Sequence, residues 1–199
     1  MPANIHYQIQ RIKVKTDKET PSLDAQWQQV VQICKAEQLG EVARARLAFN
    51  MVDYITSEDL PLRLLVTRAP QAMAQIGSET TIHKEHRLIN GKSSAMVYSK
   101  VEQMLPREMY YTTDVLATRY VNGQTRPIKA TSLFEALKQE AFITPLDGIL
   151  FLGCKRIASD IARLRKQKPD LNITMNRVEV SDSFTGTSRK MACYSLTPK

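Results

Sequence analysis

The chain has 199 residues, of which 43% are hydrophobic, so its length suits one large domain or two small ones with real cores. The net charge of +8 points to an anionic partner. Three widely spaced cysteines without metal-ligand spacing argue against a zinc site, and no apolar run is long enough for a membrane span. We therefore expect a cytoplasmic protein of a reducing compartment, without metal, small-molecule cofactor or membrane partner.

The N-terminal half is expected to combine one strand, several helices and a hairpin. Residues 5–15 alternate as a strand whose phase slips once, which is typical of a bulge or a short edge strand. Helical spacing predicts helices over 23–38 and 41–55, and a third over 61–77 that Pro70 should kink or end. Asn90-Gly91 between strand-like runs predicts a type I′ hairpin.

Helices followed by a hairpin are the order of a winged helix, so residues 1–104 are interpreted as an α+β domain with a possible second winged helix, which would supply dimerisation, a second DNA contact, or both. If this half touches DNA, its candidate contacts are Arg63, Arg68, Arg87 and Lys92. We place the boundary near residue 104, which makes 105–199 the C-terminal domain, and expect its first helix over 108–120. No internal repeat is visible by residue identity.

The stretch 131–168 has the organisation of a helix-turn-helix. Thr131 or Ser132 can cap a first helix, and Thr144-Pro145-Leu146-Asp147 combines a Thr cap, an early Pro and an acid three residues later. Gly153 allows a left-handed turn before the next helix. Residues 148–199 hold ten Lys or Arg against four Asp or Glu, so the positive charge is concentrated at this motif.

The second helix of the motif is the candidate recognition element. Ile157, Ile161 and Leu164 share one apolar face. In a helix-turn-helix the N-terminal residues of this helix meet base edges in the major groove, while other basic residues contact phosphates. The candidates for base contacts are Lys155, Arg156 and Ser159, and those for phosphate contacts are Arg163, Arg165, Lys166 and Lys168.

A β-hairpin is predicted after this helix, which Pro169 ends. Residues 172–180 alternate as a strand, 181–187 form a polar tip, and 188–196 return as a strand. Such a hairpin could act as a wing on the DNA, with Arg177, Arg189 and Lys190 as its candidate contacts.

The sequence F-I-T-P-L-D-G-I-L-F-L-G-C-K-R-I-A-S-D-I-A-R-L-R-K resembles the small winged helix-turn-helix domain of phage and prophage proteins. Gly148 stands where that domain usually has alanine, and Lys168-Pro169-Asp170 replaces its glycine turn before the wing. The resemblance covers about residues 130–197 and implies DNA binding in a mobile-element setting, without fixing a biological process. Matching positions are Thr144-Pro145-Leu146-Asp147, Arg156-Ile157-Ala158, Ile161, Leu164-Arg165-Lys166 and Tyr194-Ser195-Leu196.

Catalytic patterns are weak, so we do not expect an enzyme. His83 and His86 are spaced by three on a predicted strand, which does not suit a metal pair, and Tyr110-Tyr111 lack a nearby metal cluster. No phosphate-binding glycine loop occurs.

The sequence therefore predicts an α+β protein, mainly helical with hairpin wings, that binds double-stranded DNA. We expect a transcriptional regulator, specifically a repressor, of a phage, satellite or plasmid, acting as a homodimer because one motif makes few base contacts. The alternatives are a replication initiator with tandem winged helices on origin repeats, and a winged-helix protein-assembly or anti-host factor.

Overall fold

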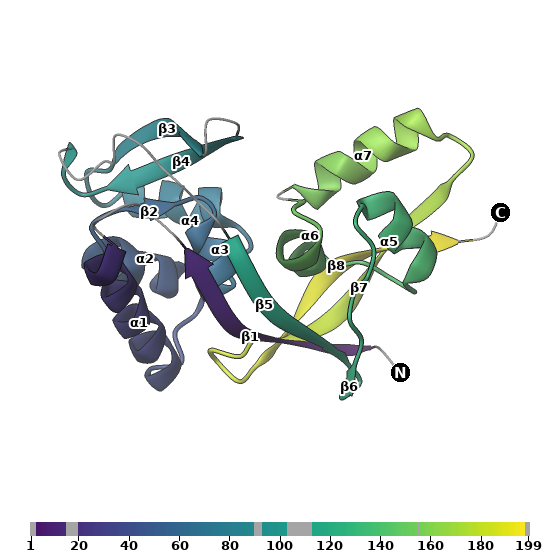
Figure 1. The fold of residues 1–199 in the computed structure, drawn as a ribbon, viewed down its shortest axis with the longest axis horizontal. Coiled ribbons are helices and arrows are strands. Elements are labelled where there is room, and N and C mark those ends of the chain that lie inside the picture. Colours follow the sequence, from purple (N-terminus) through teal and green to yellow (C-terminus); the bar gives the residue numbers. More distant parts are fainter. Residues whose placement is uncertain (1–2, 15–19, 90–92, 103–112, 155, 198–199) are drawn as a thin grey trace. The chain divides into compact units, whose positions relative to one another are not determined.

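The computed structural model describes residues 3–14, 20–89, 93–102, 113–154 and 156–197 (Figure 1). Over these residues it has seven helices and eight strands, the strands forming two sheets, which confirms the predicted α+β class. The chain divides into two compact units. Unit 1 combines residues 1–10 with 117–199, and unit 2 spans 11–116.

Four helices form most of unit 2: α1 (Thr20–Ala36), α2 (Glu41–Met51), α3 (Asp59–Leu64) and α4 (Ala69–Gly77). Their core includes Trp27, Val30, Cys34 and Phe49, all at most 2% exposed. The third predicted helix is in fact two, because Leu65 adopts a left-handed conformation with φ of 53° and ends α3. Pro70 lies in the first turn of α4, where its missing N–H costs nothing.

A three-stranded sheet completes unit 2, in the order β2-β4-β3. The predicted hairpin is confirmed as β3 (His83–Ile89) and β4 (Ser93–Ser99), while its turn, 90–92, lies outside the described residues. The second predicted helix stops at Met51 instead of continuing to 55, because β2 (Ile55–Thr56) hydrogen-bonds to β4 with Ile55 opposite Tyr98.

Unit 1 contains the predicted three helices and hairpin in order: α5 (Leu133–Gln139), α6 (Pro145–Phe151), α7 (Ile157–Gln167), β7 (Asn172–Ser181) and β8 (Ser188–Thr197). Ser132 is the residue that caps α5, accepting a hydrogen bond from the Glu135 amide. The apolar faces of α5 and α7 and the start of the hairpin share one cluster of buried residues, which includes Leu137, Ile143, Ile161, Ile173 and Tyr194.

The hairpin belongs to a five-stranded sheet of order β6-β5-β1-β7-β8. Here β1 (Asn4–Val14) runs parallel to β7 with Ile5 opposite Val180, and β5 (Thr113–Val121) pairs with β6 (Gln124–Thr125). The prediction that β1 is an edge strand is wrong, because strands flank it on both sides.

The helix predicted over 108–120 is also wrong from residue 113 onward, where the chain is strand; 108–112 lie outside the described residues. The sequence of β5, T-D-V-L-A-T-R-Y-V, is rich in β-branched residues, which favour strands. The unit division also differs from the predicted boundary near 104, since residues 1–10 belong with the C-terminal part of the chain. The parallel pairing of β1 with β7 is the physical reason.

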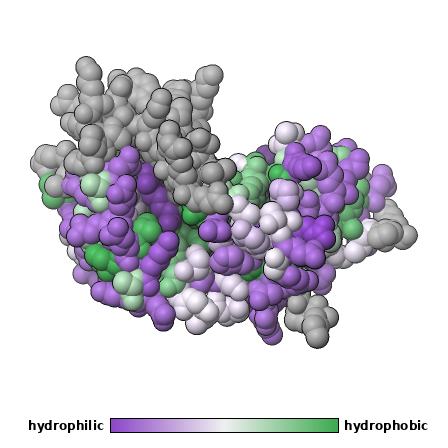
Figure 2. All heavy atoms as spheres, turned by 60° about the horizontal axis from the view of Figure 1, so that its bottom comes forward, coloured by the Kyte–Doolittle hydropathy of each residue, from purple (hydrophilic) through white to green (hydrophobic). Residues whose placement is uncertain are grey.

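Hydrophilic residues cover most of the coloured surface in Figure 2, with hydrophobic ones scattered among them. Large hydrophobic side chains exposed in the described part of the chain are Leu88, Val101 and Met175. No helix in that part is both long and apolar enough to cross a membrane. Charged and polar side chains are therefore the first candidates for a binding surface.

Candidate nucleic-acid interface

The junction between α6 and α7 is a tight turn. Gly153 has φ of +65°, the left-handed conformation predicted for it. The Cys154 amide donates a hydrogen bond of 2.8 Å to the Gly148 carbonyl, which folds the turn back onto α6. A Cβ at position 148 would lie 3.2 Å from the Cys154 carbonyl oxygen, closer than most such contacts. Glycine in place of the alanine of the resembling domains thus lets the turn approach the helix closely.

Helix α7 has one buried face and one exposed basic face. Ile157, Ile161 and Leu164 are 9% exposed or less and pack in the apolar cluster of unit 1, as predicted. Burying these three side chains stabilises the helix position by roughly 1.5–3 kcal/mol each relative to exposure. The remaining surface is open, and the exposed side chains predicted to meet DNA are Arg156, Ser159, Arg163, Arg165, Lys166 and Lys168.

Two of the three predicted base-reading residues lie together at the start of α7. Arg156 is the N-cap residue of the helix and is exposed, and Ser159 is exposed in its first turn. The Ser159 amide donates to the Arg156 carbonyl at 2.9 Å, which fixes the backbone between them. Lys155 lies outside the described residues.

The four predicted phosphate contacts are not equivalent. Arg163 is the most open: its side chain is 70% exposed and forms an ion pair of 2.7 Å with Asp160. Arg165 donates to the Ile173 carbonyl at 2.7 Å and so links the end of α7 to β7. Lys166 is exposed in the last turn. Arg163 and Lys166 are therefore the better phosphate candidates, because Arg165 also has a structural role.

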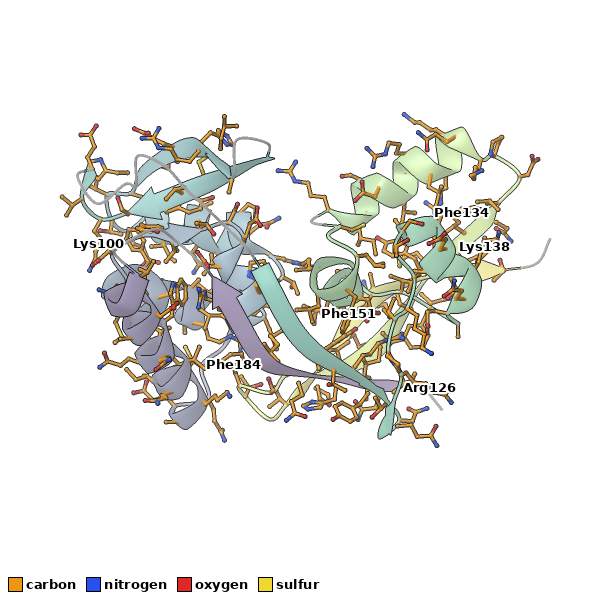
Figure 3. The ribbon with its side chains drawn as sticks, viewed as in Figure 1. Lys100, Arg126, Phe134, Lys138, Phe151 and Phe184 are labelled. Atoms are coloured by element: carbon orange, nitrogen blue, oxygen red, sulfur yellow. The ribbon has the colours of Figure 1, made fainter. Side chains whose placement is uncertain are left out.

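Lys168 lies beside a second lysine that sequence reasoning missed. Its Nζ is 4.8 Å from the centre of the Phe134 ring, and the Nζ of Lys138 is 4.9 Å from the same ring. Figure 3 shows Phe134 and Lys138 on α5, and both lysines are exposed. Because Phe134 and Lys138 are four residues apart on a helix, their spacing would have predicted this pair. The ring positions two positive charges near the C-terminal end of α7.

The hairpin brings two of its three predicted contacts to the surface. Arg177 and Lys190 are exposed on β7 and β8. Arg189 is half-buried, and this burial lowers the pKa of its guanidinium, so it is a poorer candidate for DNA contact. The tip makes contacts of its own: Phe184 is buried, and its amide donates to Asp182 Oδ1 at 2.9 Å.

A buried polar network holds the start of α6. Asp147 and Thr144 form the predicted capping arrangement in both directions, with hydrogen bonds of 2.9–3.1 Å. The Tyr7 hydroxyl from β1 donates to Asp147 Oδ1 at 2.9 Å and lies 2.6 Å from Thr144 Oγ1. Arg119 from β5 adds an ion pair, its Nε lying 3.1 Å from Asp147 Oδ1.

Burial raises the pKa of Asp147 above its ordinary value, and the charge of Arg119 lowers it. Burial likewise raises the pKa of Tyr7 well above 10.0, so this hydroxyl keeps its proton and remains a donor. Arg119 also donates to the Phe142 carbonyl at 3.1 Å and pairs with Glu140 at 3.0 Å. Sequence reasoning found the Thr144–Asp147 pair but not Tyr7 or Arg119, because only the sheet brings these strands to α6.

The four N-terminal candidates for DNA contact, all in unit 2, differ in how accessible they are. Arg63 is only 9% exposed, pairs with Asp59 at 3.0 Å and stacks over Trp27, so it is not available to DNA. Arg87 pairs with Glu85 on the same strand. Arg68 is exposed at the N-cap of α4, and Lys92 lies outside the described residues.

Over the described ranges, no three or more His, Cys, Asp or Glu side chains gather to hold a metal ion. Comparisons of the chain with protein-family models, with curated proteins and with solved structures find no match. The function is therefore argued from the exposed basic face of α7 and its surroundings.

Proposed function

We propose that residues 133–197 form a winged helix-turn-helix that binds double-stranded DNA, with α7 as its recognition helix. The observation that carries this proposal is the division of α7 into a buried apolar face and an exposed face that begins with Arg156 and Ser159. Residues at that end of a recognition helix reach base edges, and an arginine there can pair with guanine O6 and N7.

Charge supports the same partner. Unit 1 has 14 Lys and Arg against seven Asp and Glu, a net of +7, whereas unit 2 has 14 against 13, a net of +1. Almost all of the net positive charge of the chain therefore belongs to unit 1, which contains α7. Neutralising DNA phosphates releases bound counterions, which gives such a surface affinity for any duplex.

For the biological role we propose a repressor-type transcriptional regulator of a phage, satellite or plasmid, with binding and not catalysis as its activity. A replication initiator is the second candidate, favoured by one observation: unit 2 also contains consecutive helices followed by a hairpin. A chain with two such units could bind two of the repeated sites at an origin. Mapping bound sites across the host and element genomes separates the two, since promoter sites indicate regulation and iterated origin sites indicate initiation. An absence of bound sites would favour a protein-assembly role.

The electrostatic part of the proposal is tested by salt titration of binding to a random-sequence duplex. Removing two phosphate contacts with Arg163→Ala and Lys166→Ala should reduce the slope of log affinity against log salt by about 1.8. Lys35→Ala is the matched control, because it removes an exposed charge at the end of α1. A slope unchanged by the α7 substitutions would overturn the assignment.

The base-reading part is tested on a duplex selected from a random library. Arg156→Ala should lower the preference for selected over random duplex by about 1–3 kcal/mol if Arg156 pairs with a guanine. An equal loss of affinity for both duplexes would make Arg156 a phosphate contact only.

A further inference from the structure

The capping network of α6 occurs a second time, in unit 2. The Thr56 amide and hydroxyl donate to Asp59 Oδ2 at 3.0 and 2.8 Å, and the Asp59 amide donates to Thr56 Oγ1 at 3.1 Å. Thr144 and Asp147 make the same three hydrogen bonds at 2.9, 3.0 and 3.1 Å. The two pairs are separated by 88 positions in the sequence.

The turn that follows is also repeated with the same separation. Leu65 and Gly153 both adopt the left-handed conformation, with φ of 53° and 65°. The next residue then donates its amide to the carbonyl six residues earlier, from Val66 to Leu60 at 3.1 Å and from Cys154 to Gly148 at 2.8 Å. This pair of features is a helix C-terminal motif that fixes the direction of the following chain.

The helices that follow these two turns, α4 and α7, begin in the same way. Arg68 and Arg156 are both N-cap residues, with φ and ψ of −114° and 50° for the first and −134° and 65° for the second. Three buried positions correspond: Ala69, Met73 and Ile76 in α4, and Ile157, Ile161 and Leu164 in α7. Ala72 is buried as well, whereas its counterpart Asp160 is partly exposed.

The hairpins complete the correspondence. Ile55, just before Thr56, lies opposite Tyr98 of β4, and Ile143, just before Thr144, lies opposite Tyr194 of β8. Both tyrosines are 9% exposed. We infer that residues 55–99 and 143–195 are two copies of one structural module, although few of their residues are identical.

The copies differ in charge on the exposed side of the second helix. The positions of Arg163, Arg165 and Lys166 are occupied in the first copy by Gln75, Gly77 and Ser78, and α4 has no charged residue. The two positions at the start of the helix keep hydrogen-bonding groups. Arg68 corresponds to Arg156, Gln71 corresponds to Ser159, and all four are exposed.

These observations suggest that the two units make different kinds of contact with DNA, an inference that rests on the proposed function. We propose that unit 2 reads a second element of base sequence in the same DNA through Arg68 and Gln71, while unit 1 supplies the phosphate contacts. Arginine suits guanine and glutamine suits adenine in the major groove. A module without phosphate contacts binds DNA weakly alone, but a covalent link to a bound module raises its effective concentration.

The test is selection of duplexes from a random library by the full-length chain, followed by sequencing. The wild type should enrich two sequence elements in the same duplex. Arg68→Ala with Gln71→Ala should keep only one of them and bind the wild-type site about 10- to 100-fold more weakly, with binding to random duplex almost unchanged. Lys35→Ala should behave as the wild type. Because both altered side chains are exposed, thermal melting should be unaffected.

Other outcomes separate this proposal from the one it rests on. If the wild type enriches no sequence, DNA reading by either unit is overturned. The wild type could instead enrich one element, which is lost in Arg156→Ala but kept in the α4 variant with Arg68→Ala and Gln71→Ala. In that case α7 remains a recognition helix, and the proposal that unit 2 reads base sequence is overturned. If the α4 variant leaves the selected site intact but changes the oligomeric mass in light scattering, the exposed side of α4 is a protein interface instead.

Discussion

Arg119 and Asp147 form a buried ion pair that ties the central sheet of unit 1 to the first turn of α6. Arg119 Nε lies 3.1 Å from Asp147 Oδ1, and the two side chains are 2% and 0% exposed. The same carboxylate caps α6 by accepting from the Thr144 amide at 2.9 Å. The helix that precedes the proposed recognition helix is therefore positioned by a residue of β5, more than 25 residues earlier in the chain.

Removing the arginine should destabilise unit 1 strongly. Arg119→Met leaves Asp147 buried without its opposite charge, and breaking such a pair costs about 3–5 kcal/mol of unfolding free energy. The remaining hydrogen bonds from Thr144 and Tyr7 place the expected loss near the lower end. Urea denaturation followed by circular dichroism measures it. Arg126→Met, at an exposed arginine, is the control and should change stability by less than about 0.5 kcal/mol.

The loss caused by Arg119→Met should depend on pH. Burial raises the pKa of Asp147 and Arg119 lowers it, so without Arg119 the folded variant keeps a proton on Asp147 to higher pH than the wild type does. The difference in unfolding free energy between the two proteins is then largest above the pKa of Asp147 in the folded variant. It shrinks as the pH falls through that pKa. A difference that stays constant from mildly acidic to mildly alkaline pH would show that Asp147 does not respond to Arg119.

The turn between α6 and α7 should require glycine at position 153. Gly153→Ala places a Cβ on a residue with φ of +65°, which costs about 1–2 kcal/mol although the space around it is open. Gly77→Ala is the comparison, because Gly77 has no positive φ and a Cβ there meets Ile82 at an ordinary distance of 3.4 Å. This second change should be neutral or stabilising. Comparing the melting temperatures of both variants shows whether glycine is needed at position 153 because of its positive φ or because of steric crowding.

Substitutions of two neighbouring basic residues of α7 should have different effects, one on stability and the other on DNA binding. Arg165→Ala removes the hydrogen bond to the Ile173 carbonyl and should lower the unfolding free energy by about 1 kcal/mol. Lys166→Ala should leave stability within about 0.5 kcal/mol while weakening DNA binding. Equal stability of the two variants would mean that the link between α7 and β7 contributes nothing measurable.

Local patterns in the sequence were sufficient for most of the C-terminal elements. The Thr144–Asp147 cap, the left-handed Gly153, the apolar positions of α7 and the hairpin after Pro169 all depend on residues a few positions apart. Physical preferences at that range can be read directly from the sequence. The same patterns also brought Arg156 and Ser159 to one exposed end of a helix.

Errors arose where distant strands decide the outcome. Residues 113–120, part of the helix predicted over 108–120, are strand, and β1 was predicted as an edge strand, because neither segment shows its partners in its own sequence. Arg63 was a candidate DNA contact until the fold placed it against Trp27 and Asp59. The resemblance between the two modules was also invisible by residue identity, since its evidence is hydrogen bonds and backbone angles shared by different side chains.

The sequence by itself determined the caps, the turns and the amphipathic helices of this protein, because these follow from the chemistry of neighbouring residues. Only the tertiary structure decided that β1 lies beside β7, that Arg119 and Tyr7 meet Asp147, and that Thr56–Asp59 repeats Thr144–Asp147. The pairing of β1 with β7 and the hydrogen bond from Tyr7 to Asp147 join residues more than a hundred positions apart, and the Arg119–Asp147 ion pair joins a strand to a helix 28 positions later. Their partners are chosen by the shape and polarity of the assembled core, which no local pattern contains.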